Sequence, residues 1–202
     1  MAPSQSLWWS SLESPVTPRA RLGEHLDVDV AIVGGGFTGL WTARELLRRD
    51  GSLRIAVLEK EVCGFGASGR NGGWASGLFP LSNASVIERF GRPAFDHQRR
   101  VLQNAVVELG ASARDDGIDA RYVRGGTMTF ARSELQRARL LDEVETAREE
   151  GLDTHDLSWL DPGALAEHGH VSGALGATYS PHCARIEAAT VPLRQVRRSF
   201  RR

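Results

Sequence analysis

Three glycines near the start of the chain have the spacing G-x-G-x-x-G: Gly34, Gly36 and Gly39. They follow a short β-branched run at 28–33, which is typical of a buried parallel strand. After them, apolar residues repeat at helical spacing over 38–49, and a second apolar run follows at 53–58. The spacing alone is a weak signal, but a strand before it and a helix after it are the context that a dinucleotide-binding turn requires. The sequence therefore predicts a strand–turn–helix–strand unit that binds a dinucleotide.

Each glycine of this motif has its own physical reason to lack a side chain. Gly34 permits the tight turn out of the strand, Gly36 lets the backbone approach a pyrophosphate, and Gly39 lets the helix pack closely. Phe37 and Thr38 stand at the start of the helix, where free N–H groups and the helix dipole favour phosphate. The alternative interpretation is a glycine-rich turn in some other α/β unit.

Glu59 lies at the end of the second predicted strand, 20 residues after Gly39. A carboxylate at this position can accept hydrogen bonds from a dinucleotide ribose. An arginine there would suit a 2′-phosphate, so Glu59 argues against NADP. Without the glycines, Glu59 would be interpreted as a solvated charge at a strand end.

A second glycine-rich segment begins nine residues after Glu59 and consists of Ser68, Gly69, Arg70, Asn71, Gly72 and Gly73. Its glycines and polar side chains can bring many hydrogen-bond donors close to a flat polar ring or a phosphate. By itself, the segment is equally consistent with a flexible surface loop. In an ordinary NAD domain the next segment would normally be another helix, so this segment favours a different dinucleotide.

The pattern as a whole predicts an α/β fold with four parts: an N-terminal arm at 1–27, a Rossmann-type βαβ unit with its glycine-rich loop at 28–80, an α+β segment at 81–190, and a basic tail at 191–202. We expect an extended arm that Leu7, Trp8 and Trp9 anchor to the body of the protein. Further along the chain we expect a loop over 62–80, a helix over 86–115 broken near 91–93, a helix over 134–150 with Ser133 as its N-cap, and short strands at 121–123, 127–130 and 174–179.

Composition excludes several classes of function. Lys plus Arg number 25 and so do Asp plus Glu, and this zero net charge argues against a general electrostatic interaction with nucleic acid or anionic membrane. Cys63 and Cys183 are too few for a disulfide framework or a four-cysteine zinc site. His168, His170 and His182 match no zinc spacing, and we expect them on the surface. We therefore expect a cytoplasmic protein without a metal, nucleic-acid or membrane partner.

The two glycine motifs together resemble the FAD-dependent oxidoreductases of the D-amino-acid oxidase, glycine oxidase and sarcosine oxidase type. The resemblance is carried by residues 29–40, 57–59 and 64–73, with weaker likeness at 125–127 and 179–182. Within that family, the chain is most similar to the branch that includes gamma-glutamylputrescine oxidoreductase. The resemblance implies FAD as the cofactor, with Gly34, Gly36 and Gly39 at the pyrophosphate, Glu59 at the adenosine ribose, and residues 68–73 near the flavin.

The same resemblance implies a reaction. The flavin of this family takes a hydride from a carbon–nitrogen bond of a small-molecule amine or amino acid, and the resulting imine hydrolyses in water. Oxygen or another acceptor then reoxidises the flavin. The 81–190 segment would correspond to part of the substrate domain. The resemblance identifies no catalytic residue in this chain.

Members of this family typically run to about twice this length, with a second substrate-domain segment and a further glycine-rich stretch. We therefore expect a truncated chain or an N-terminal fragment. Two alternatives follow. One is a catalytically inactive remnant that at most binds a nucleotide, and the other is an NAD-linked dehydrogenase.

Overall fold

The structure, a computed structural model, describes residues 6–12, 16–190 and 192. The chain divides into two compact units: the first comprises Met1–Gly73, Ala111–Tyr122 and Ile186–Arg202, and the second comprises Trp74–Gly110 and Val123–Arg185. The domain ranges expected from the sequence are continuous, whereas both of these units combine separate stretches of chain. The expected basic tail lies outside the described residues, except for Pro192.

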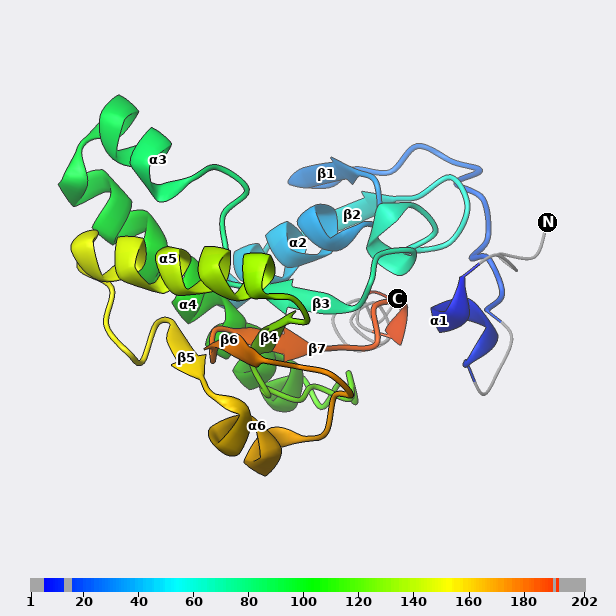
Figure 1. Cartoon of the computed structure of the whole chain (residues 1–202). Coiled ribbons are helices and arrows are strands. Elements are labelled where there is room, and N and C mark those ends of the chain that lie inside the picture. Colours follow the sequence, from blue (N-terminus) through cyan, green and yellow to red (C-terminus); the bar gives the residue numbers. More distant parts are fainter. Residues whose placement is uncertain (1–5, 13–15, 191, 193–202) are drawn as a thin grey trace. The chain divides into compact units, whose positions relative to one another are not determined.

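The first unit is built on a parallel strand pair. Its elements are helix α1 (Leu7–Ser10), strand β1 (Val30–Val33), helix α2 (Phe37–Arg49), strand β2 (Ile55–Leu58) and the 3₁₀ helix η1 (Ala67–Gly69). β1 and β2 pair in parallel, with Val30 opposite Ile55 and Val33 opposite Leu58. α2 connects the two strands and packs against both (Figure 1). Leu40 of this helix is fully buried. The strand–turn–helix–strand prediction is confirmed, and α2 begins one residue earlier than expected.

The expectation that β1 is a buried strand is wrong for this structure. Its side chains alternate between half-buried and exposed, and Val33 is 87% exposed. Side chains of a strand point alternately to opposite faces, and α2 covers only one face of the pair. Every second residue of β1 therefore points away from the helix.

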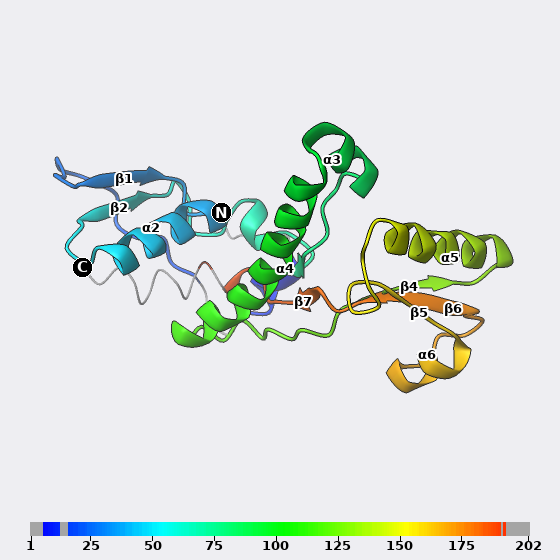
Figure 2. The same cartoon turned by 90° about the vertical axis from the view of Figure 1, so that its left-hand side faces the viewer.

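The second unit contains strands β3 (Trp74–Ser76), β4 (Thr127–Ala131), β5 (Ser158–Leu160), β6 (Gly176–Ser180) and β7 (Cys183–Arg185), and helices α3 (Asn83–Phe90), α5 (Glu134–Glu149) and α6 (Pro162–His168). It also contains helix α4 (Arg92–Asp115) up to Gly110, and the last turn of that helix belongs to the first unit. The strand order is β4–β6–β5 in an antiparallel sheet, and β3 and β7 form a separate antiparallel pair. α5 lies on one side of the three-stranded sheet and α6 on the other (Figure 2). No helix within the described residues is long and apolar enough to cross a membrane.

Several elements of the second unit follow the sequence signals. The helix expected over 86–115 is broken at Gly91, which has φ of +81°, so α3 and α4 are separate. Ser133 caps α5, because its hydroxyl accepts a hydrogen bond of 3.3 Å from the Gln136 N–H. The strand expected at 121–123 is reduced to a single bridge between Val123 and Arg185.

Four short elements of the second unit were not predicted from the sequence: β3, β5, α6 and β7. The three strands have three residues each, which is too short to show periodicity. β3 lies inside the segment expected to be a loop. The sequence did carry a signal for α6, because Asp161 is a typical N-cap residue and Pro162 suits the first helical position. In the structure, Asp161 accepts a hydrogen bond from the Ala164 N–H.

The N-terminal arm differs from the expected extended segment because it contains the short helix α1. Trp9 is buried, with only 7% of its surface exposed, and Trp8 donates a hydrogen bond to Asn71. The anchoring role expected of these two residues is confirmed. The same expectation is wrong for Leu7, which is 71% exposed.

Replacing Gly176 in β6 should destabilise the second unit. Its φ is +137°, and a Cβ atom there would collide with the Trp159 ring and lie 2.8 Å from the Leu160 carbonyl oxygen. We expect Gly176→Ala to lower the free energy of unfolding by about 3 kcal/mol, measured by urea denaturation. Gly125→Ala is the control, because a Cβ at Gly125 meets no atom within 4 Å. Equal effects of the two substitutions would contradict this account.

Candidate functional site

The glycine turn between β1 and α2 is shaped by two different constraints. Gly34 has φ of +101°, a conformation that residues with a side chain rarely adopt. At Gly39 the constraint is space, because a Cβ atom would collide with the Gly34 carbonyl oxygen and lie 3.2 Å from Ile32 Cγ2. The first turn of α2 therefore packs directly on the end of β1.

The N-terminus of α2 lacks a cap from its own segment. Gly36 is the N-cap residue and has no side chain to accept a hydrogen bond. The Phe37 N–H is instead bound by the Ser68 hydroxyl oxygen, 2.9 Å away, from the second glycine-rich segment. Among the described residues, the N–H groups of Thr38 and Gly39 find no acceptor. These two donors and the helix dipole suit an anion, so the turn fits the pyrophosphate of a dinucleotide.

Glu59 contacts the turn directly. Its Oε2 accepts a hydrogen bond of 2.7 Å from the Gly35 N–H, and its Oε1 accepts one of 3.0 Å from the Glu61 N–H. A carboxylate has about four acceptor positions, so two of them remain for other donors, such as ribose hydroxyls. Glu59 therefore stabilises the glycine turn itself, a role that the sequence did not predict in addition to the expected contact with the ribose.

Cys63 is a neighbour of the turn whose position the sequence did not reveal. A Cβ atom on Gly35 would lie 2.6 Å from Cys63 Sγ, and the Gly64 N–H donates to the Gly35 carbonyl oxygen at 2.8 Å. Gly35, which lies between the first two glycines of the motif, is thus required by packing against 63–64. Burial raises the pKa of the Cys63 thiol, and the charge of Glu59 raises it further. The raised pKa favours the protonated thiol, and the sulfur packs against Gly35.

The second glycine-rich segment is held together by its own polar groups. Asn71 donates from Nδ2 to the carbonyl oxygens of Ala67 and Ser68, and its Oδ1 accepts from the Gly73 N–H. The Arg70 guanidinium lies 4.3 Å from the centre of the Phe65 ring. The structure thus brings Ser68 to the turn, whereas the Asn71 side chain serves the loop itself. Gly72 and Arg70 are exposed.

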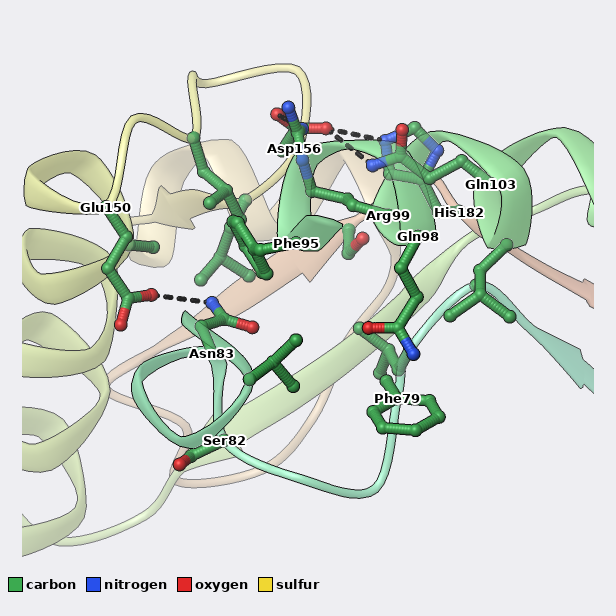
Figure 3. Close-up of a pocket in the computed structure, with 18 of the residues that line it drawn as sticks. Phe79, Ser82, Asn83, Phe95, Gln98, Arg99, Gln103, Glu150, Asp156 and His182 are labelled. Carbon is green, nitrogen blue, oxygen red and sulfur yellow. Dashed lines mark hydrogen bonds and ion pairs between the residues drawn. The ribbon is translucent and has the colours of Figure 1, made fainter. Parts of the chain in front are cut away.

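The second unit contains a cavity of about 400 Å³, lined by residues from α3, α4, α5 and the connecting loops (Figure 3). Asp156 stands at one end of it and accepts hydrogen bonds from Arg99 at 2.5 Å and Gln103 at 2.7 Å. His182 Nε2 lies 3.1 Å from the same carboxylate. At the other end, Asn83 donates to Glu150 at 2.6 Å. The volume is within the range of small-ligand pockets.

The expectation that the histidines lie on the surface is wrong for His182, whose side chain is only 16% exposed. Its Nε2 faces the Asp156 carboxylate. Arg99, Gln103 and His182 together satisfy Asp156, so this carboxylate is a structural link between three segments, not a free base. Among the described residues, no three His, Cys, Asp or Glu side chains gather to hold a metal ion.

A comparison with protein families matches residues 29–197 to a family described as "DAO: FAD dependent oxidoreductase". Among curated relatives, the gamma-glutamylputrescine oxidoreductase of Escherichia coli (strain K12) is 30% identical over 169 residues, which are 82% of this chain and 38% of that protein. The chain therefore spans less than half the length of this relative.

Solved structures show the same fold. The glycine oxidase from Geobacillus kaustophilus superimposes with a TM-score of 0.64 and 25% identity, over 85% of this chain and 45% of that one. The L-amino acid deaminase from Proteus myxofaciens, in complex with anthranilate, gives a TM-score of 0.67 at 17% identity, over 93% of this chain and 39% of that one. At such identities the second likeness concerns the fold alone.

The Asp156 cluster should make the second unit sensitive to acid. Burial by itself raises the pKa of Asp156, but the Gln103 hydrogen bond and the Arg99 charge outweigh it, so the pKa is lowered. A lowered folded-state pKa stabilises the protein above the unfolded-state value of about 3.9, and this stabilisation is lost as the pH falls through the folded-state pKa. We expect urea denaturation to show a loss of stability below about pH 4 that is smaller in Asp156→Asn.

At pH 7 the same substitution should lower the free energy of unfolding by about 3 kcal/mol, because it leaves the Arg99 charge without its partner. Asp142→Asn, on the exposed face of α5, is the matched control and should leave both quantities unchanged. An acid profile of Asp156→Asn that is identical to that of the original chain would contradict the assignment.

Proposed function

This chain belongs to the family of FAD-dependent oxidoreductases, and on that premise we propose that it binds FAD and serves the oxidation of an amine or amino acid. The observation that carries the proposal is the N-terminus of α2. Two of its N–H groups have no acceptor among the described residues, and glycine leaves the backbone open to a close-lying phosphate.

The proposed cofactor contacts follow the order of the chain. Residues 34–39, including the N–H groups of Thr38 and Gly39, would hold the pyrophosphate. The two remaining acceptor positions of Glu59 would bind the adenosine ribose while the carboxylate keeps its contact with Gly35. Residues 68–73 would lie near the flavin, with Ser68 joining them to the start of α2.

The proposed reaction divides the work between cofactor and protein. FAD, when bound, would accept a hydride from the carbon atom of the substrate's carbon–nitrogen bond. The residues described here hold and orient the cofactor, and none of them is assigned a proton-transfer step. The names of relatives, a gamma-glutamylputrescine oxidoreductase and a glycine oxidase, support an amine or amino acid as the substrate class.

The proposal also covers the binding partner and the cellular compartment of the protein. Zero net charge supports a small-molecule substrate over nucleic acid or membrane as the binding partner. Cys63 and Cys183 are free thiols, which supports a reducing compartment such as the cytoplasm. Nicotinamide dinucleotide is the competing cofactor, and the second glycine-rich segment supports FAD over it.

The cofactor assignment predicts a yellow protein. After incubation with FAD and gel filtration, the chain should retain a flavin absorption band, and NAD should not compete for the site. Gly36→Val should abolish retention, because its side chain would fill the phosphate approach and its Cβ would lie 3.0 Å from the Ser68 hydroxyl oxygen. Gly51→Ala is the control, since a Cβ there makes only an ordinary contact of 3.8 Å with Leu47 O. Retention of FAD by Gly36→Val would refute the assignment.

Turnover is a separate prediction. If the chain contains a working site, amines or amino acids should reduce the bound flavin and release hydrogen peroxide in air, which a peroxidase-coupled assay detects. Each turnover would consume one substrate, one oxygen and one water, and would yield a carbonyl product, an amine or ammonia, and one peroxide. A chain that binds FAD but never bleaches with any amine would be a nucleotide-binding protein without this activity.

A further inference from the structure

The glycines of the second glycine-rich segment face two tryptophans of α1. A Cβ atom on Gly73 would lie 2.5 Å from Trp8 Cζ2, and one on Gly69 would lie 2.9 Å from Trp9 Nε1. Real Cβ contacts are not this short, so each glycine leaves room for one indole ring. The two tryptophans therefore rest on the loop at positions where it has no side chains.

Hydrogen bonds fix the same contact. Trp8 Nε1 donates to the Asn71 carbonyl oxygen at 2.6 Å, and the Ser6 hydroxyl donates to the Gly69 carbonyl oxygen at 2.9 Å. Both acceptors are main-chain atoms of the loop, so the arm contacts the loop backbone over 69–71. The two segments are 63 residues apart in the sequence.

A side chain at Gly69 is excluded by lack of space, and the Gly64 carbonyl oxygen is a nearer obstacle than the Trp9 ring. The φ of Gly69 lies outside the left-handed region, so alanine would cause no backbone strain there. What excludes a side chain is space, which the Trp9 ring and the Gly64 carbonyl oxygen occupy. Trp9 is 7% exposed, and its Nε1–H has no acceptor among the described residues. Packing of the ring, rather than a hydrogen bond, therefore holds Trp9 in place.

We propose that α1 is a clamp in which Trp8 and Trp9 hold the 67–73 loop, and with it Ser68, in the conformation that receives the flavin cofactor. The link to the site is Ser68, whose hydroxyl oxygen accepts from the Phe37 N–H at the start of α2. Trp8 and Trp9 are thus positioning residues that act through the loop. The effect on cofactor affinity rests on the proposed function, whereas the clamp itself concerns the chain without cofactor.

The test is amide hydrogen exchange on the full chain without FAD, followed by FAD titration. In the double variant Trp8→Ala/Trp9→Ala we expect exchange of the 67–73 amides to accelerate by at least about tenfold, while α2 and α5 keep their protection. FAD affinity should fall by a similar factor. Trp9→Phe should cause a smaller loss than the double variant, because it keeps an aromatic ring in the buried position but removes the five-membered ring whose Nε1 and Cε2 lie closest to Gly69. Leu7→Ala, an exposed residue of the same helix, is the matched control.

Each outcome of the exchange experiment supports or overturns the clamp proposal. Unchanged loop exchange in the double variant, or an equal change in Leu7→Ala, would overturn the clamp. If α2 also loses protection, the first unit has unfolded. Trp8→Phe then decides, because it removes the hydrogen bond to Asn71 and part of the indole contact with Gly73 while it keeps an aromatic ring. Unchanged exchange at 69–73 in that variant overturns the proposal. If the original chain binds no FAD, the proposed function fails, while the exchange data still report on the clamp.

Discussion

The first unit depends on the close approach of α2 to the end of β1. Gly39 packs on the Gly34 carbonyl oxygen, and no residue with a Cβ atom could take its place without moving the helix. This contact directs the N-terminus of α2 to the point where β1 ends, together with the Thr38 and Gly39 N–H groups, which find no acceptor among the described residues. An anion at that point gains from the helix dipole and from hydrogen bonds that need no rearrangement.

Two segments that follow later in the chain complete this turn. Glu59 binds the Gly35 N–H from the end of β2, and Ser68 binds the Phe37 N–H from the second glycine-rich segment. Cys63 fills the space beside Gly35. The polar groups that a nucleotide would meet are therefore arranged by contacts within the protein. Such preorganisation lowers the conformational cost of binding.

In the second unit, the charged side chain of Asp156 connects separate segments of the chain. Asp156 is largely buried, with 13% of its side chain exposed, and it joins α4 to the loop before β5 and to the turn between β6 and β7. Removal of either partner of such a pair would leave an uncompensated buried charge. The sequence offers no local sign of it, since Arg99 and Asp156 are 57 residues apart.

The glycine spacing, the flanking apolar runs and Glu59 sufficed to predict the βαβ unit, because each has a local physical cause within about 30 residues. Three-residue strands such as β3 and β7 could not be predicted, because they exist only through pairing with each other, and their sequences show no periodicity. Contacts between distant segments likewise arose only on folding: Trp8 and Trp9 on the loop, Cys63 against Gly35, and His182 beside Asp156. The sequence by itself determined which backbone must lack side chains, since that is a property of residue type. Only the tertiary structure decided what occupies the space that those glycines leave, because that depends on which distant segments pack there.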